Sequence, residues 1–261
     1  MSITTTSAQI FNQWNHPINV AVVGASGGVG YALCQQLYAC EHVSHVIRIS
    51  RSSCPALNEN NLLHKKITHD IRLDYEDKSS VKDQLNPFLE LNIPIHILII
   101  ASGFLHNSTQ GPEKKLEHFS HDFLMKNIRI NASGPIEVIQ TLRPQLTGAH
   151  QSVIAVLSAK VGSIEDNQIG GWYSYRTSKA ALNMLLKTTS IEWRKYRNSA
   201  IVSVHPGTVY THLSAPFTSS NTQLNIRSPA VAAEDILKVI SQLSAKDNGR
   251  FLDYKGNNLP W

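Results

Sequence analysis

The 261-residue sequence lacks any hydrophobic run long enough to cross a membrane. Its longest apolar stretch, residues 93–101, is interrupted by Pro94 and His96, whereas a spanning helix needs about 20 apolar residues. The N-terminus has no basic segment followed by an apolar core, which predicts that no secretory signal is present. These absences exclude a membrane-embedded protein and favour the cytoplasm.

Cysteine is scarce, and the three present, Cys34, Cys40 and Cys54, have no metal-ligand spacing. Their odd number suits a reducing compartment, which again favours the cytoplasm. Histidine is abundant, with twelve residues. Because the histidines show no ligand spacing with nearby Cys, Asp or Glu, we expect no metal site.

Long basic runs are also absent, although the net charge is +5 and the pI is near 9.1. A nucleic-acid surface would need basic residues gathered together and interleaved with aromatics, and here they are scattered. The sequence therefore predicts no nucleic-acid partner, and its basicity suits an enzyme that binds an anionic cofactor. The composition, 42% hydrophobic and 16% charged, is that of an ordinary globular protein.

Strand and helix patterns alternate along the chain with no repeat and no linker. Short apolar, β-branched runs predict strands at residues 18–23, 45–50, 67–73, 94–100, 152–157, 200–205 and 249–254. Helical spacing predicts helices at residues 31–40, 77–91, 119–146, 172–196 and 228–243, with Asp77 as an N-cap and a kink at Pro135. This order predicts one α/β domain over residues 18–261 after a frayed lead-in over residues 1–17. Its core would be a doubly wound, mostly parallel sheet of about seven strands.

A glycine-rich turn lies between the first strand and the first helix, in the segment Gly24-Ala-Ser-Gly-Gly-Val-Gly30. Such a turn lets backbone amides approach a pyrophosphate, which sits at the positive end of the helix. The context predicts a single-domain Rossmann fold that binds a dinucleotide. The residues expected to hold it are Gly24, Ser26, Gly28, Val29 and Gly30.

The second strand ends in Ser50-Arg51, where a dinucleotide's adenosine ribose is recognised. An acid at this point would bind the ribose hydroxyls and repel a 2′-phosphate. A guanidinium can instead pair with a 2′-phosphate through two hydrogen bonds. Arg51 therefore predicts NADP(H) in preference to NAD(H). The alternative is that Arg51 is only a solvated loop residue.

A tyrosine and a lysine stand four residues apart in the segment Tyr175-Arg-Thr-Ser-Lys179, which opens a run with helical spacing. Positions i and i+4 lie on one face of a helix. An ammonium near a phenol favours the phenolate and lowers the phenol pKa. Such a tyrosine can exchange a proton with an alcohol or carbonyl oxygen near neutral pH. By itself the spacing also fits an amphipathic helix with no catalytic role.

Taken together, these motifs resemble the short-chain dehydrogenase/reductase family over about residues 18–254, and the phrases VGSI and GGWYSYRTSKAALN resemble its C-factor-like branch. That branch is similar to carbonyl reductases, and some members are linked to signalling. The resemblance implies that Tyr175 is the general acid in carbonyl reduction. It also implies that Lys179 lowers the pKa of Tyr175 and binds the nicotinamide ribose. Asn131 would hold a water in a proton relay to the lysine.

The resemblance also implies further contacts with the cofactor. Asp74 matches the acid that bonds the adenine, with Tyr75 beside it. The segment that packs on the nicotinamide end matches Pro206, Gly207, Val209 and Thr211. The turn after the fourth strand, where glycine lets the chain pass close to the cofactor, matches Ala101, Ser102 and Gly103.

Two positions depart from the family pattern. The family's Asn-Ala-Gly after the fourth strand is Ala101-Ser102-Gly103 here, so that loop needs a different support. The family's substrate-orienting serine falls at Ala159, and the residue before it is Ser158. A hydroxyl donor near the substrate oxygen is needed to polarise it. Ser158 is our first candidate and Ser163 the second, and with neither the site would be crippled.

These features predict an oxidoreductase that acts on a small carbonyl or alcohol substrate. The alternative is a dinucleotide-binding signalling protein with little turnover. Family resemblance implies a homodimer or homotetramer through the helices at residues 119–146 and 172–196. The walls of the substrate pocket are expected from loops at residues 104–113, 163–172 and 211–227, where one sequence carries the least information.

Overall fold

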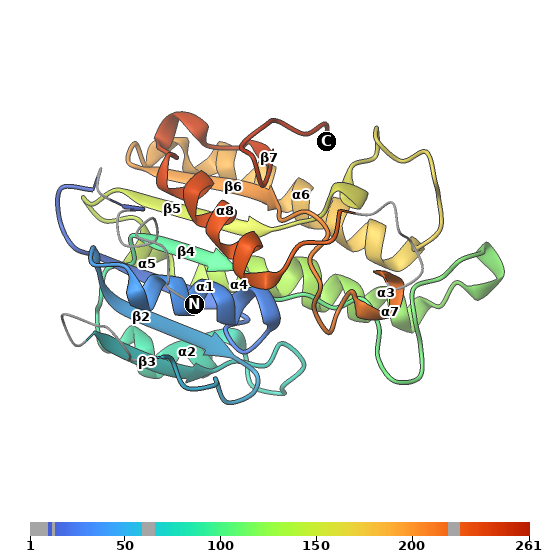
Figure 1. Cartoon of the computed structure of the whole chain (residues 1–261), viewed down its shortest axis with the longest axis horizontal. Coiled ribbons are helices and arrows are strands. Elements are labelled where there is room, and N and C mark those ends of the chain that lie inside the picture. The colour runs from blue at the N-terminus through green and yellow to red at the C-terminus, as the bar shows by residue number, and fades with distance from the viewer. Residues whose placement is uncertain (1–9, 12–13, 59–65, 219–224) are drawn as a thin grey trace.

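A computed structural model of the chain describes residues 10–11, 14–58, 66–218 and 225–261 (Figure 1). Within these residues, seven strands form one parallel sheet in the order β3-β2-β1-β4-β5-β6-β7. The strands are β1 (Ile18–Val23), β2 (Val43–Ser50), β3 (Ile67–Arg72), β4 (Ile97–Ile100), β5 (Ser152–Leu157), β6 (Ser199–His205) and β7 (Phe251–Asp253). The predicted doubly wound sheet is confirmed. The strand order reverses between β1 and β4, the point at which such sheets bind ligands.

Helices cover both faces of the sheet (Figure 1). One face carries α1 (Gly28–Ala39) and α8 (Pro229–Ser241), which pack against each other. The other face carries α2 (Val81–Leu89), α4 (Gly134–Thr141) and α6 (Tyr173–Glu192). Three further helices are α3 (His121–Ile128), α5 (Arg143–Leu146) and α7 (Ala215–Thr218). Because both faces are covered, the central strands are apolar throughout rather than alternating.

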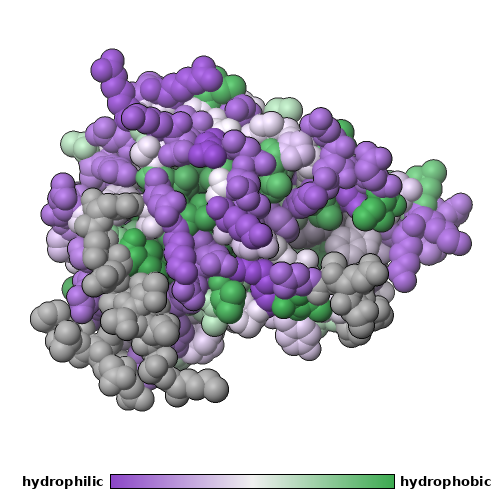
Figure 2. All heavy atoms as spheres, turned by 45° about the horizontal axis from the view of Figure 1, so that its top comes forward, coloured by the Kyte–Doolittle hydropathy of each residue, from purple (hydrophilic) through white to green (hydrophobic). Residues whose placement is uncertain are grey.

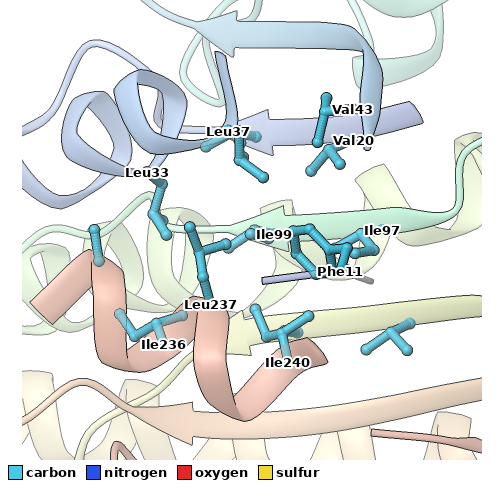
Figure 3. Packing of buried hydrophobic residues seen from close by; sticks show 14 of the residues in the cluster. Phe11, Val20, Leu33, Leu37, Val43, Ile97, Ile99, Ile236, Leu237 and Ile240 are labelled. Atoms are coloured by element: carbon cyan, nitrogen blue, oxygen red, sulfur yellow. The ribbon is translucent and has the colours of Figure 1, made fainter. Parts of the chain in front are cut away.

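The core under α1 and α8 extends to the N-terminal segment (Figure 3). Leu37 of α1 and Ile240 of α8 pack there with Ile97 of β4, and all three are fully buried. Phe11 is also fully buried in this cluster, and Trp14 is 5% exposed. The sequence predicts a frayed lead-in, but two aromatic side chains of that segment belong to the core. The rest of residues 1–13, apart from Ile10, lies outside the described residues.

Helix α2 begins later than the sequence pattern predicts. Its N-cap is Ser80, not Asp77. The Ser80 hydroxyl accepts from the Asp83 backbone N–H, and the Asp83 carboxylate accepts from the Ser80 backbone N–H, which is a capping box. Asp77 instead accepts from the backbone and side chain of Ser79 in the preceding turn. The reciprocal pair satisfies two donors, so it fixes the start of the helix.

The predicted helix over residues 119–146 is divided into shorter pieces. Between α3 and α4 the chain forms a five-residue π-helical turn, Arg129–Ser133. Pro135 lies in the first turn of α4, directly after the π turn. The predicted break is confirmed, and it consists of a widened turn as well as a proline. Such π turns often mark functional sites.

Among the described residues, no helix is both long enough and apolar enough to span a bilayer. The face drawn in Figure 2 is largely hydrophilic, with hydrophobic residues exposed singly or in small groups. The same part of the chain holds no cluster of three or more His, Cys, Asp and Glu side chains that could bind a metal ion. Cys34 and Cys54 are free thiols.

Candidate active site

The carboxyl ends of β1, β4 and β6 meet at the glycine-rich turn. Gly24 has a positive φ of 81°, and a Cβ on it would lie 2.7 Å from the Ser102 backbone N. Gly28 faces the chain after β6, because a Cβ there would lie 2.9 Å from Cγ2 of Thr211. Ala101 donates its N–H to Val23 at 2.8 Å. Segments predicted separately as cofactor-binding are therefore in direct contact.

The N-terminus of α1 has backbone N–H groups that can bind an anion. Its N-cap, Gly27, has no side chain to bond the first-turn amides, so these N–H groups are available to a ligand. The turn is tight, because Gly27 donates to Gly24 O at 3.0 Å and a Cβ on Gly30 would lie 2.1 Å from that oxygen. Ser26 and Val29 flank the turn. These residues fit a dinucleotide pyrophosphate, since side chains at the glycines would fill the cradle.

The loop after β2 borders this cradle. Ser52 Oγ lies 3.1 Å from Ser26 Oγ, and the Arg51 side chain beside it is exposed. At the end of β3, one carboxylate oxygen of Asp74 accepts from the Glu76 N–H at 2.9 Å. The Asp74 side chain is only partly buried, so it keeps capacity to accept from an adenine amino group.

Tyr75, beside Asp74, is buried rather than facing solvent. Its ring lies 2.6 Å from where a Cβ on Gly134 would be, and its hydroxyl is 3.3 Å from Ser102 Oγ. It thus supports both α4 and the turn after β4. The side-chain amide of Gln84 accepts from the backbone N–H of Asp74 at 2.7 Å and donates to the Asp74 C=O at 2.9 Å. The sequence does not predict this supporting role of Gln84.

Tyr175 and Lys179 lie one turn apart on α6, 8% and 3% exposed. The Lys179 ammonium donates to the Leu157 carbonyl, at the end of β5, at 3.0 Å and lies 5.9 Å from the Tyr175 ring centroid. Burial raises the pKa of Tyr175 to about 12 and lowers the pKa of Lys179 to about 8. The sequence predicts a lowered pKa for the Tyr175 phenol, and this prediction is wrong for the polypeptide alone. Loss of hydration outweighs the attraction of an ammonium whose own charge is disfavoured.

Asn131 is fully buried in the π turn. Its side-chain amide pairs with the backbone of Phe104, accepting from the N–H at 2.7 Å and donating to the C=O at 2.8 Å. It also donates to Ser178 Oγ on α6 at 2.9 Å. This pairing supplies the support that the loop after β4 needs in place of the family's asparagine at Ala101.

Both candidate serines have partners away from Tyr175. The Ser158 hydroxyl donates to Oδ1 of Asn183 at 2.7 Å. The Ser163 hydroxyl donates to the Trp261 carbonyl at 3.0 Å. Among the described residues, no hydrogen bond joins either serine to Tyr175. Ser158 can orient a substrate only if its hydroxyl gives up the hydrogen bond to Asn183 when the substrate binds.

The segment after β6 is fastened by Arg227, which motif reasoning missed. Its guanidinium donates to the Pro206 carbonyl at 2.9 Å and lies 3.9 Å from the Tyr254 ring centroid. Gly207, with φ of 78°, leaves room for both of these side chains. Val209, 6% exposed, forms an isolated β-bridge with Arg227. In the sequence Arg227 is a charged residue that belongs to no motif, so its role could not be predicted.

Aromatic rings from the three predicted pocket loops meet beside Tyr175. Phe217 has its ring centroid 5.4 Å from those of His106 and Trp172, and Trp172 lies 6.1 Å from Tyr175. The third loop is described only in part, since residues 219–224 lie outside the described residues. No periodic pattern identifies these rings in the sequence, because His106 lies in a loop, Trp172 at a helix cap and Phe217 in the four-residue helix α7.

Residues 19–222 match the short chain dehydrogenase family. The chain belongs to this family, as its motifs predict, and it is an NAD(P)-dependent oxidoreductase. It is 33% identical over 168 residues to C-signal of Myxococcus xanthus, covering 64% of this chain and 93% of that protein. It is 28% identical over 242 residues to a 1-hydroxy-2-glutathionyl-2-methyl-3-butene dehydrogenase of a Rhodococcus species, covering 93% and 99%. The first similarity supports the C-factor-like branch.

Two solved structures have the same fold. The NADPH-bound carbonyl reductase from chicken fatty liver superposes with a TM-score of 0.79 at 24% identity, over 94% of this chain and all of that one. The carbonyl reductase Sniffer of Drosophila melanogaster gives 0.78 at 21% identity over the same shares. The predicted Rossmann-type architecture is therefore confirmed.

Proposed function

We propose that this protein is an NADP(H)-dependent carbonyl reductase in which Tyr175 protonates the substrate oxygen. The observation that carries the proposal is the buried Tyr175–Lys179 pair, held by the end of β5 and bordered by the chain ends that form the dinucleotide cradle. A bound nicotinamide supplies the hydride, which goes to the carbonyl carbon. The Tyr175 proton goes to the carbonyl oxygen, and the product is an alcohol.

The state of Tyr175 favours this direction. With a pKa of about 12, its hydroxyl keeps its proton across the physiological range, which suits a general acid better than a general base. Lys179, with a pKa of about 8, is mostly charged at neutral pH and can bond the nicotinamide ribose. In alcohol oxidation each step is reversed, and the phenol must first lose its proton.

The catalytic role is tested with Tyr175→Phe against Tyr173→Phe, a matched change on the same helix at a side chain that is 36% exposed. A panel of carbonyls is assayed with NADPH. We expect Tyr175→Phe to lower kcat by about 100-fold or more, the usual contribution of general acid catalysis, and Tyr173→Phe to resemble wild type. Equal turnover by wild type and Tyr175→Phe would sink the assigned role.

Preference for NADP(H) is proposed from Arg51, which is exposed beside the Ser26–Ser52 contact at the edge of the cradle. The test is Arg51→Ala, with Arg72→Ala as control, because Arg72 is another exposed arginine at the end of the neighbouring strand. NADPH and NADH are titrated separately. Arg51→Ala should weaken only NADPH, by about tenfold or more for a lost charge-assisted bond. An unchanged NADPH affinity would mean that Arg51 is a solvated loop residue.

Ser158 remains our proposed substrate-orienting residue, because it directly follows Leu157, the residue that binds Lys179. Its bond to Asn183 also favours a second candidate function, a cofactor-binding regulatory protein with little turnover. Ser158→Ala and Ser163→Ala separate the cases. Loss of kcat in Ser158→Ala alone supports the reductase, whereas NADPH binding without turnover of any carbonyl in the wild type supports the regulatory protein.

Self-association is proposed through α3 and α6, which pack together and expose Met125, Met184, Leu185 and Ile191. These side chains would be covered in a homodimer or homotetramer. Light scattering after gel filtration should give a multiple of the 29.0 kDa chain mass. Met184→Lys should shift that mass towards the single chain, and a monomeric wild type would refute this proposal.

A further inference from the structure

The first turn of α6 is capped by a residue from a distant loop. Glu113, in the loop after β4, is 2% exposed. One of its carboxylate oxygens accepts from the Ser174 backbone N–H at 3.1 Å, and the other accepts from the Ser174 hydroxyl. Its backbone carbonyl accepts from the Trp172 N–H. One residue thus satisfies three donors at the start of the catalytic helix.

The helix needs an external cap because its own N-cap provides none. Trp172 occupies that position in the left-handed region, with φ of 53° and no side-chain capping bond. The two residues before it, Gly170 and Gly171, also have positive φ. A bulky residue in this region is strained and persists only where its surroundings hold it. The buried carboxylate compensates, because it accepts from the Ser174 N–H and hydroxyl and faces the positive end of the helix dipole.

The residues that Glu113 holds belong to the site. Tyr175 directly follows Ser174, and the Trp172 ring packs at 6.1 Å from Tyr175 and 5.4 Å from Phe217. Lys179 is fastened separately, by the Leu157 carbonyl. Loss of the cap therefore loosens the turn that carries Tyr175 while the lysine stays anchored.

We propose that Glu113 is a positioning residue, which acts through Ser174 and Trp172 to hold the Tyr175 hydroxyl in reach of the substrate oxygen. The inference rests on the proposed function and assigns this carboxylate a part in it. Glu113→Ala removes both side-chain bonds. Glu113→Gln can keep both, since the amide oxygen accepts from the Ser174 N–H and the amide nitrogen donates to the Ser174 hydroxyl.

The kinetic test compares these two variants with Ser152→Ala. Ser152 is 1% exposed and makes two side-chain hydrogen bonds at the amino end of strand β5, the end opposite the site, so its loss destabilises the fold away from the site. We expect Glu113→Ala to lower kcat by about 10- to 100-fold, the effect of a small misplacement, with the KM for NADPH unchanged. Glu113→Gln should restore most of kcat, and Ser152→Ala should lower Tm without changing kcat.

A second readout does not depend on turnover. Carbon-13 labelling of tyrosine, assigned by comparison with Tyr175→Phe, follows phenol ionisation at about pH 10.5, where an ordinary tyrosine is mostly ionised. Tyr175 should stay protonated in wild type and Glu113→Gln, and it should ionise in Glu113→Ala because water reaches the loosened turn. If the wild type reduces no carbonyl, the proposed function fails, and this titration still decides the role of Glu113. The inference is overturned if Glu113→Ala matches wild type in both readouts, or if Glu113→Gln loses as much as Glu113→Ala.

Discussion

Acid should destabilise this protein through His96, a histidine far from the catalytic pair. His96 is 7% exposed, and its Nδ1 accepts a hydrogen bond from the Asn19 backbone N–H at 3.0 Å. The rings of His16 and His150 lie 5.0 and 4.9 Å away. Burial, followed by the neighbouring His150 and His16, lowers the pKa of His96 from 6.5 to about 4. Protonation would add a buried charge and abolish the acceptor.

The sign of the pH dependence follows from proton binding. Between about pH 6.5 and pH 4 the unfolded chain binds a proton at this position and the folded chain does not, so acidification favours unfolding. Above that range neither state is protonated, and below it both are, so the effect levels off. Linkage with the two pKa values puts the loss at about 2 kcal/mol at pH 5 and about 3 kcal/mol in full.

The measurement is urea unfolding of the wild type and His96→Asn between about pH 7.5 and pH 5, where the linked loss develops. Asn does not titrate, and its amide oxygen can replace Nδ1 as acceptor for Asn19. Other titrating groups, such as His205 with its pKa lowered to about 4 by burial, contribute to both proteins and cancel. The wild type should lose about 2 kcal/mol more than the variant. Parallel stability curves would refute the reasoning.

Three further outcomes are expected. Gly134→Ala should destabilise the protein by about 1–3 kcal/mol by overpacking, because its Cβ would lie 2.6 Å from the Tyr75 ring; a Tyr75→Leu double-mutant cycle in urea should recover most of the loss. Gly30→Ala should weaken NADPH binding by about tenfold or more, measured by fluorescence titration, since its Cβ would displace the Gly24 carbonyl that shapes the cradle. Carbonyl reduction should fall as pH rises through the Lys179 pKa of about 8, approaching tenfold per pH unit, and Lys179→Arg should move the fall to higher pH.

Most of the fold could be predicted because parallel strands buried on both faces form continuous apolar runs. β1 and β5 have the predicted bounds for this reason. Predictions were wrong where side-chain hydrogen bonds decide the outcome. The Ser80–Asp83 pair sets the start of α2. The burial of Phe11 depends on a cluster of side chains from distant parts of the chain, which local sequence does not reveal.

The candidate site was predictable as far as its residues follow strand ends or helical spacing. Ser102 lies against Gly24 and Thr211 against Gly28 because three parallel strands end on the same side of the sheet. The pKa values of the catalytic pair were not predictable, because they depend on how deeply the two side chains are buried. The spacing of Tyr175 and Lys179 suggests an ammonium that ionises a phenol, whereas loss of hydration shifts the two pKa values the other way.

Three buried residues share a physical role, and sequence analysis predicted only the first of them, Asn131, as part of the site. Asn131 holds the backbone of the loop after β4, Arg227 holds the chain after β6, and Glu113 holds the start of α6. Each is buried, and each bonds backbone groups of a neighbouring segment. A bond to backbone does not depend on the partner's side chain. The ring-bearing positions of the pocket loops can therefore change identity, and with it the substrate that fits, while the catalytic pair and the cofactor cradle keep their geometry.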